Sequence, residues 1–449
     1  MTFLLFSLFF SLPLLAQNPS QTFGLQDLVN RALDNNMEVA AARWKVAAST
    51  ADLRKATSAR FLPRLRLDIE SGLVPEAKGD IFNPPSDTSG VRPLGPFGRT
   101  ELEFIQPIYP FSRGRQIKSA AENGVGVEEA NLLKAQIEAA FEVKKLYHGL
   151  LLAQDLLNLV QRLQEELEEQ RGEIEESPTL PMSNLYKFEL ALIELDKQER
   201  EAATQLDLAQ RALAWQTGIG DASSLQLRAR WLAPVQTHEM NLDALQTRAL
   251  SQRPDWRKLQ SGIAATKALH KAAKEAYKPQ VFIGGGVRFA IAPGRTDQRN
   301  PFVKDEFNLF NGAAFIGVRQ SLEFHLLAAD VAKAEAEYRQ LSSMKEHAQR
   351  GAQLDVQRAH AQYLRAESDL EAARQSRSLA RQWLKEAKDE YEFDPDQLKE
   401  LISAFESWAL IEQQYFQSIY DFNVSVATLE MACGGLQLSG EDPGSLRND

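Results

Sequence analysis

The sequence contains a single cysteine, Cys433, among its 449 residues. One thiol excludes an intrachain disulfide framework and any metal site built from several cysteines. The histidines do not suggest a catalytic or metal centre either, because none has a second ligand at helical spacing. Their positions are His148, His238, His270, His325, His347 and His360. We therefore expect no enzyme, no cofactor and no metal site.

The chain also lacks an excess of basic residues. It has 51 lysines and arginines against 61 acidic residues, and its formal net charge is −10. Such a chain gains little from counterion release on a phosphate backbone. Nucleic acid is therefore not expected among its partners.

Long apolar runs are absent after residue 16, and none of the later stretches could cross a bilayer as a helix. Residues 1–16 are almost uninterrupted apolar sequence ending in Leu14-Leu15-Ala16, which is typical of a secretory signal peptide. The stretch is shorter than the roughly 20 residues of a spanning helix. If the mature chain spans a membrane, it must do so with strands.

Two halves of the chain repeat the same order of sequence signals. Arg31-Ala32-Leu33 recurs as Arg248-Ala249-Leu250, and Phe61-Leu62-Pro63 is matched by Tyr277-Lys278-Pro279. Each proline ends a helix, because the residue before a proline avoids the α conformation. The predicted boundaries are 1–16 for the signal peptide, 17–220 for the first repeat, 221–240 for a linker, 241–435 for the second repeat and 436–449 for a C-terminal tail.

Each half also carries two segments in which apolar and polar residues alternate, as in strands. Leu65, Leu67 and Ile69 begin the first pair, and a Pro/Gly-rich loop separates them from Leu102 and Phe104. The second pair contains Val281, Ile283, Val287 and Phe289, and then Ala314, Ile316 and Val318. Residues 284–286 are all glycine, and inside a strand they indicate a close backbone approach rather than a phosphate loop.

Four segments of about ten residues match the tilted strands of an outer-membrane barrel, and clustered phenylalanines around them indicate aromatic girdles. Four strands cannot close a barrel, whereas a trimer would supply twelve. The alternative is a soluble sheet packed on the helices.

The rest of each half is helical. Residues 115–176 lack proline and would form a helix roughly 90 Å long. Coiled-coil seams follow Leu146, Leu150, Ala153, Leu157, Val160, Gln164 and Leu167, and then Val356, Ala359, Tyr363, Ala366, Leu370 and Ala373. Turns at 177–181 and 394–395 break the two helices. The predicted fold class is mainly α with a small β part, with long antiparallel helical hairpins and four strands per chain.

The segment Gln106-Pro107-Ile108-Tyr109-Pro110-Phe111-Ser112-Arg113-Gly114-Arg115 resembles the "QPLFDGGR" element of the TolC-like outer membrane efflux proteins. Leu28 to Asn36, "LVNRALDNN", and the repeated order of elements extend this resemblance over nearly the whole mature chain. It implies a homotrimer in the outer-membrane lipid, with a β-barrel and a periplasmic α-helical tunnel. It also implies a passive export duct of a tripartite efflux or type I secretion system, with a periplasmic adaptor and an inner-membrane transporter as partners.

Residues 391–404 are similar to the family's "YEAGLISLLDLLDA" segment at the periplasmic entrance. Our hypothesis is that Glu400, with Asp394 and Asp396, forms an acidic ring there that favours cations. The alternative is that all three are solvated turn residues. For the protein as a whole, the alternatives are a periplasmic coiled-coil scaffold or adaptor without a membrane barrel, and a binding protein or enzyme that uses the tunnel interior.

Overall fold

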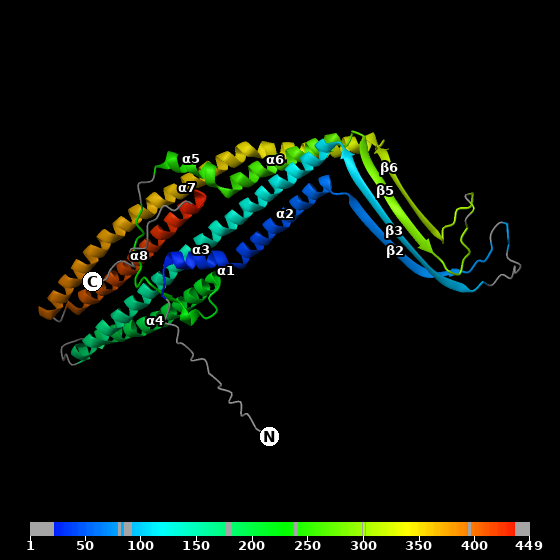
Figure 1. The fold of residues 1–449 in the computed structure, drawn as a ribbon. Helices are drawn as coiled ribbons and strands as arrows, with labels where there is room; N and C mark the ends of the chain where they lie inside the picture. The colour runs from blue at the N-terminus through cyan, green and yellow to red at the C-terminus, as the bar shows by residue number, and fades with distance from the viewer. Residues whose placement is uncertain are drawn as a thin grey trace, which may run out of the picture. The chain divides into compact units, whose positions relative to one another are not determined.

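The computed structural model describes residues 22–79, 82–84, 92–175, 182–237, 241–298, 300, 302–393 and 397–435. The predicted signal peptide, the C-terminal tail and both helical-hairpin turns lie outside these residues. Figure 1 shows the ribbon with its helices and strands labelled.

The elements follow the repeated order that the sequence predicts. The first half contains α1 (Leu25–Asn35), α2 (Met37–Phe61), β2 (Arg64–Pro75), β3 (Leu94–Tyr109), α3 (Phe111–Glu175) and α4 (Met182–Thr217). The second half contains α5 (Leu242–Gln252), α6 (Pro254–Glu275), β5 (Gln280–Ile291), β6 (Leu309–Arg319), α7 (Phe324–Phe393) and α8 (Leu398–Ala432). The predicted fold class is confirmed, and the limits of the two repeats stay a prediction.

The chain folds into two compact units, each of which takes segments from both halves. The helical unit consists of the described residues within Met1–Ala41, Leu133–Arg253 and Arg350–Asp449. The sheet unit consists of those within Ala42–Leu132 and Pro254–Gln349.

The sheet unit is built around a four-stranded antiparallel sheet with strand order β2-β3-β5-β6 (Figure 1). The central pair joins the two sequence halves, since β3 pairs with β5 from Gly98 opposite Ile291 to Tyr109 opposite Val281. The three glycines lie in β5, as predicted, and they allow close packing. A Cβ atom at Gly285 would lie 2.5 Å from the carbonyl oxygen of Ala313 on β6.

The core of the helical unit is formed by α1, α3, α4, α5, α7 and α8. Val356, Ala359, Tyr363 and Leu370 of the predicted α7 seam are buried in this unit. On α3 the predicted seam is only partly right, because Leu159 and Leu163 are more buried than Leu157 and Val160. The reason is that α3 contacts helices on two sides. Gln161 of α3 donates a hydrogen bond to Glu199 of α4, and Lys144 of α3 forms an ion pair with Glu430 of α8.

The predicted linker contains structure that the sequence did not reveal. A short 3-10 helix, η1 (Ala222–Ser224), leads into β4 (Gln226–Leu227), which pairs in parallel with β1 (Thr22–Phe23). Residues 228–237, which we call the strap, then run across the helices and bury Ala229, Leu232 and Val235. The strap thus belongs to the core rather than to a free connection.

Candidate functional site

The four-stranded sheet has two chemically different faces. Successive residues of a strand point to opposite faces, and directly paired residues of neighbouring strands share a face. Large apolar side chains occupy one face, which we call the apolar face, and they are exposed: Leu65, Leu67, Ile69 and Leu73 on β2, Val287, Phe289 and Ile291 on β5, and Phe310, Ile316 and Val318 on β6. None of the residues of β2, β3, β5 and β6 on this face is charged. An exposed apolar surface of this kind marks contact with a membrane or another protein.

The opposite face, which we call the polar face, carries charged residues of both signs. Arg288 on β5 lies opposite Glu101 on β3 and forms two hydrogen bonds with it, of 2.6 and 3.1 Å. Arg99 on β3 likewise pairs with Glu70 on β2. The sequence predicted the alternation of these strands correctly, whereas it gave no sign of which charges would pair.

The sequence predicted an acidic site at the end of the second helical hairpin. Glu400 lies in the first turn of α8, is exposed, and accepts a 3.2 Å hydrogen bond from the indole Nε1–H of Trp383 on α7. Asp394 and Asp396 lie outside the described residues. The structure therefore places one of the three predicted site residues.

The helices around Glu400 are held together by a small apolar cluster. Phe188 of α4, Leu384 and Ala387 of α7, and Leu401 and Ala404 of α8 are buried together there. Lys388 of α7 also pairs with Glu166 of α3. Packing and charge thus fix the position from which Glu400 reaches solvent.

Further along the α7–α8 hairpin lies a buried ion cluster that the sequence did not reveal. The Glu412 side chain is 1% exposed and accepts hydrogen bonds from Arg377 and Arg381. The Arg377 guanidinium also lies over the Tyr415 ring, 4.2 Å from its centroid. Burial opposes ionisation of Glu412, but the two guanidinium groups prevail and lower its pKa.

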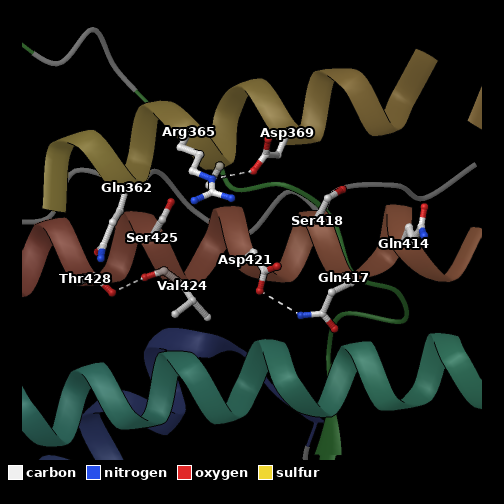
Figure 2. A pocket seen from close by; sticks show the side chains of 11 residues that line it. Gln362, Arg365, Asp369, Gln414, Gln417, Ser418, Asp421, Val424, Ser425 and Thr428 are labelled. Atoms are coloured by element: carbon white, nitrogen blue, oxygen red, sulfur yellow. Dashed lines mark hydrogen bonds and ion pairs between the residues drawn. The ribbon is translucent and has the colours of Figure 1, made fainter. Parts of the chain in front are cut away.

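A groove with a volume of about 460 Å³ lies between α7 and α8. Most of its lining residues have polar or charged side chains, among them Gln362, Gln414, Gln417, Ser418 and Thr428, although carbon atoms form most of the exposed wall. Figure 2 shows the Arg365–Asp369 ion pair of α7 and the 2.9 Å hydrogen bond from Gln417 to Asp421 of α8 along it. The polar side chains can exchange hydrogen bonds with a partner surface, and the carbon atoms between them can be covered by it.

The strap is fastened by buried polar groups. Asp155 of α3 accepts a 2.8 Å hydrogen bond from the backbone N–H of Leu232. Burial raises the pKa of Asp155 to about 6, although that hydrogen bond and the charges of Arg162 and Arg377 act in the opposite direction.

Asn423 of α8 fastens the strap from the other side. Its amide oxygen accepts a 2.9 Å hydrogen bond from the N–H of Val235, and its amide nitrogen donates one of 2.8 Å to the carbonyl of Ala233. The same amide nitrogen lies 3.3 Å from Nδ1 of His148. Burial lowers the pKa of His148 to about 3, so the ring is neutral.

The described residues contain neither a membrane-spanning helix nor a cluster of metal ligands. No described helix is long and apolar enough to cross a bilayer. No three His, Cys, Asp or Glu side chains in the same part of the chain are grouped as a metal ion would require.

Comparison with known proteins finds a family model that matches part of the chain. Residues 28–172 match the family described as outer membrane efflux protein. No curated protein matches the sequence. The family match confirms the predicted resemblance over this part of the chain.

Solved structures extend the similarity to nearly the whole chain. The chain is similar to the Campylobacter jejuni CmeC outer membrane channel, with a TM-score of 0.74 and 17% identity over 92% of this chain and 85% of that one. A membrane protein from Pseudomonas aeruginosa has a TM-score of 0.74 and 19% identity over 93% and 95% of the chains. The open state of the Neisseria gonorrhoeae MtrE outer membrane channel has a TM-score of 0.74 and 17% identity over 92% and 90%. These structures share the predicted fold, and two of them are named as channels.

Proposed function

With residues 28–172 matching the outer membrane efflux protein family, we propose that the chain is the outer-membrane channel of a tripartite efflux or type I secretion system. It would act as a passive duct from the periplasm to the exterior, and an inner-membrane transporter would supply the energy. The chain itself would make and break no bonds.

The observation that carries this proposal is the two-faced sheet. An apolar face without charge matches the lipid side of an outer-membrane strand, and a charged opposite face matches a water-filled interior. Within the described residues, its edge strands β2 and β6 each have one side without a partner strand. Three copies that paired β6 of one with β2 of the next would close a twelve-stranded barrel and leave no open edge.

The first experiment tests location and assembly together. The chain is extracted from outer membranes with detergent, and the migration of boiled and unboiled samples is compared alongside the mass of the particle. A heat-sensitive trimer is expected. A monomer extracted without detergent would contradict the proposal and favour the coiled-coil scaffold or adaptor.

Two matched variants on β6 test the orientation of the sheet. Ile316→Arg places a charge on the apolar face, whereas Asn311→Arg places it on the polar face. An arginine facing lipid near the bilayer midplane costs about 2–4 kcal/mol per chain. Only Ile316→Arg should therefore reduce the amount of heat-sensitive trimer, and equal yields would contradict the assignment of the two faces.

The partner that we propose for the α7–α8 groove is the periplasmic adaptor. The groove is lined by carbon atoms and by exposed amide groups, and the amide groups can exchange hydrogen bonds with a helical partner. Gln417→Cys places a thiol in it, while Leu410→Cys places one on an exposed position of α8 outside the lining. The native thiol of Cys433 is fully buried and does not compete for the reagent.

The expected result is that a thiol-specific cross-linker joins Gln417→Cys to the adaptor, identified by mass spectrometry, more efficiently than it joins Leu410→Cys. The reverse order would exclude the groove as the contact surface.

We also retain the acidic ring as part of the proposal. Three copies of Glu400, together with Asp394 and Asp396, would place carboxylates around one axis and favour cations. Glu400 is exposed and lies at a helix end, which supports this role. A solvated turn residue would have the same exposure and position. Glu400→Ala should change single-channel conductance and block by multivalent cations, whereas Glu406→Ala, an exposed change on the same helix, should not. Unchanged conductance and block in Glu400→Ala would remove the ring from the proposal.

A further inference from the structure

Six charged strand residues of the polar face form three ion pairs, and Arg64, Glu103 and Arg319 are the other charged strand residues on this face. Arg66 pairs with Asp68 at 2.8 Å on β2, Arg99 of β3 pairs with Glu70 of β2, and Arg288 of β5 pairs with Glu101 of β3. Each pair contributes one positive and one negative charge. The three pairs together therefore add no net charge to this face.

The Glu101–Arg288 pair has the most restrictive geometry of the three. Arg288 donates from both Nε and Nη2 to the two oxygens of Glu101, which holds the guanidinium and carboxylate in one plane. The side chains are 24% and 39% exposed, so solutes beside the face can reach the pair although it is partly covered. Both residues lie within their strands and not in a loop, so solutes that move along the polar face would pass the pair.

We propose that Glu101 and Arg288 determine the charge preference of the polar face, and that their pairing lets solutes of either sign pass. This inference rests on the proposed function, in which the polar face lines the pore. A close pair of opposite charges has a weak field beyond its own length, so neither cations nor anions are held. If Arg288 is neutralised, Glu101 loses the guanidinium that binds it, and a trimer would place three such carboxylates at one level. Arg99 also lies near Glu101, but it is already paired with Glu70.

A purely structural role for the pair is the competing explanation. Cross-strand ion pairs stabilise a sheet and help to fix its register. Loss of either Glu101 or Arg288 would then reduce the stability of the trimer, and the two single variants would behave alike. A role in charge preference differs, because the two single variants should have opposite effects on permeation and the double variant should restore the original behaviour.

The test compares the wild-type protein with Arg288→Gln, Glu101→Gln and the double variant as purified trimers in planar bilayers. Hexaamminecobalt(III) and a trisulfonated dye are added in turn to each side of the membrane. From the side of the strand loops, the cation should block Arg288→Gln at about tenfold lower concentration than wild type. The dye should block Glu101→Gln at about tenfold lower concentration than wild type. The double variant should have the wild-type sensitivity to both ions.

The outcomes separate this inference from the proposed function. If the wild-type protein conducts and both single variants keep wild-type sensitivity to both ions, the inference is wrong and the channel remains. If the wild-type trimer does not conduct even with its helical end opened by the adaptor, the proposed function itself fails. Should Arg288→Gln yield no trimer, Glu101→Gln decides the question through the dye alone, and wild-type sensitivity there overturns the inference.

Discussion

Replacing Asp155 with asparagine should stabilise the helical unit at neutral pH. Asp155 is 7% exposed and holds the strap through the N–H of Leu232. Asparagine is nearly the same size, and its amide oxygen can accept the same hydrogen bond without a buried charge. The variant therefore removes the charge and keeps the contact.

The magnitude follows from the pKa of Asp155, which rises from an ordinary value of 3.8 to about 6 in the folded chain. A raised carboxyl pKa means that the folded state binds the proton more tightly than the unfolded state does. The stability gained from this proton is complete below pH 3.8 and is lost as the pH rises through 6. At about 1.4 kcal/mol per pH unit, the ionised carboxylate costs about 3 kcal/mol at pH 7.5. Asp155→Asn should recover up to about that amount.

The assay is thermal unfolding of the detergent-solubilised protein, followed by helical circular dichroism between pH 4 and 8. The variant should unfold a few degrees higher than wild type at pH 7.5, and the difference should disappear near pH 4. Asp421→Asn, at an exposed position of α8, is the control and should show no such trend.

The neighbouring His148 does not confuse this comparison. Its pKa falls from 6.5 to about 3, so its contribution to stability is present above pH 6.5 and is lost as the pH falls toward 3. That effect is the same in wild type and variant and cancels in their difference. A difference that stays constant with pH would show that the carboxyl of Asp155 titrates normally, which would refute the reasoning.

Three further predictions concern other buried positions. Glu412→Gln leaves two guanidinium groups without their carboxylate, and it should lower the free energy of unfolding by about 3–5 kcal/mol, measured by the same thermal assay. Burial raises the pKa of Cys433 to about 11, so a maleimide at pH 7.5 should label the thiol only after denaturation, and labelling of the folded trimer would contradict its burial. Gly285→Val adds a side chain where a Cβ atom would lie 2.5 Å from the Ala313 carbonyl oxygen, so the heat-sensitive trimer should be lost, and a normal yield would contradict the close approach of β5 and β6.

Local patterns in the sequence were enough to predict the long helices, the four strands of the larger sheet and the alternation along those strands. Alternation along Leu65, Leu67 and Ile69 places them on one face whatever the strand pairs with. The prolines at 63 and 279 mark helix ends for an equally local reason, since a proline restricts the residue before it. These predictions needed no knowledge of tertiary contacts.

The contacts between distant segments could not be predicted in this way. Glu101 and Arg288 are 187 residues apart, and they meet only because β3 pairs with β5. Asp155 stands in a helical sequence where an acidic residue usually faces solvent, and nothing nearby predicts that the strap covers it. The strap itself buries single apolar residues in an irregular segment, which gives no periodic signal.

The buried polar groups of the helical unit constrain the register of its long helices. A coiled-coil seam repeats every seven residues, so two long helices could slide by one repeat and still bury apolar side chains. Glu412 and Arg377 cannot pair after such a slide, and each would remain buried without its partner. Replacing such a pair with apolar residues is often neutral or stabilising, whereas removing one partner is costly, and this asymmetry is what penalises a wrong register. The strap adds a second constraint, because Asp155 on α3 and Asn423 on α8 bind backbone groups only three residues apart. A shift of α3 relative to α8 would break one of these bonds, so the strap ties the two helical hairpins to one another at a single level.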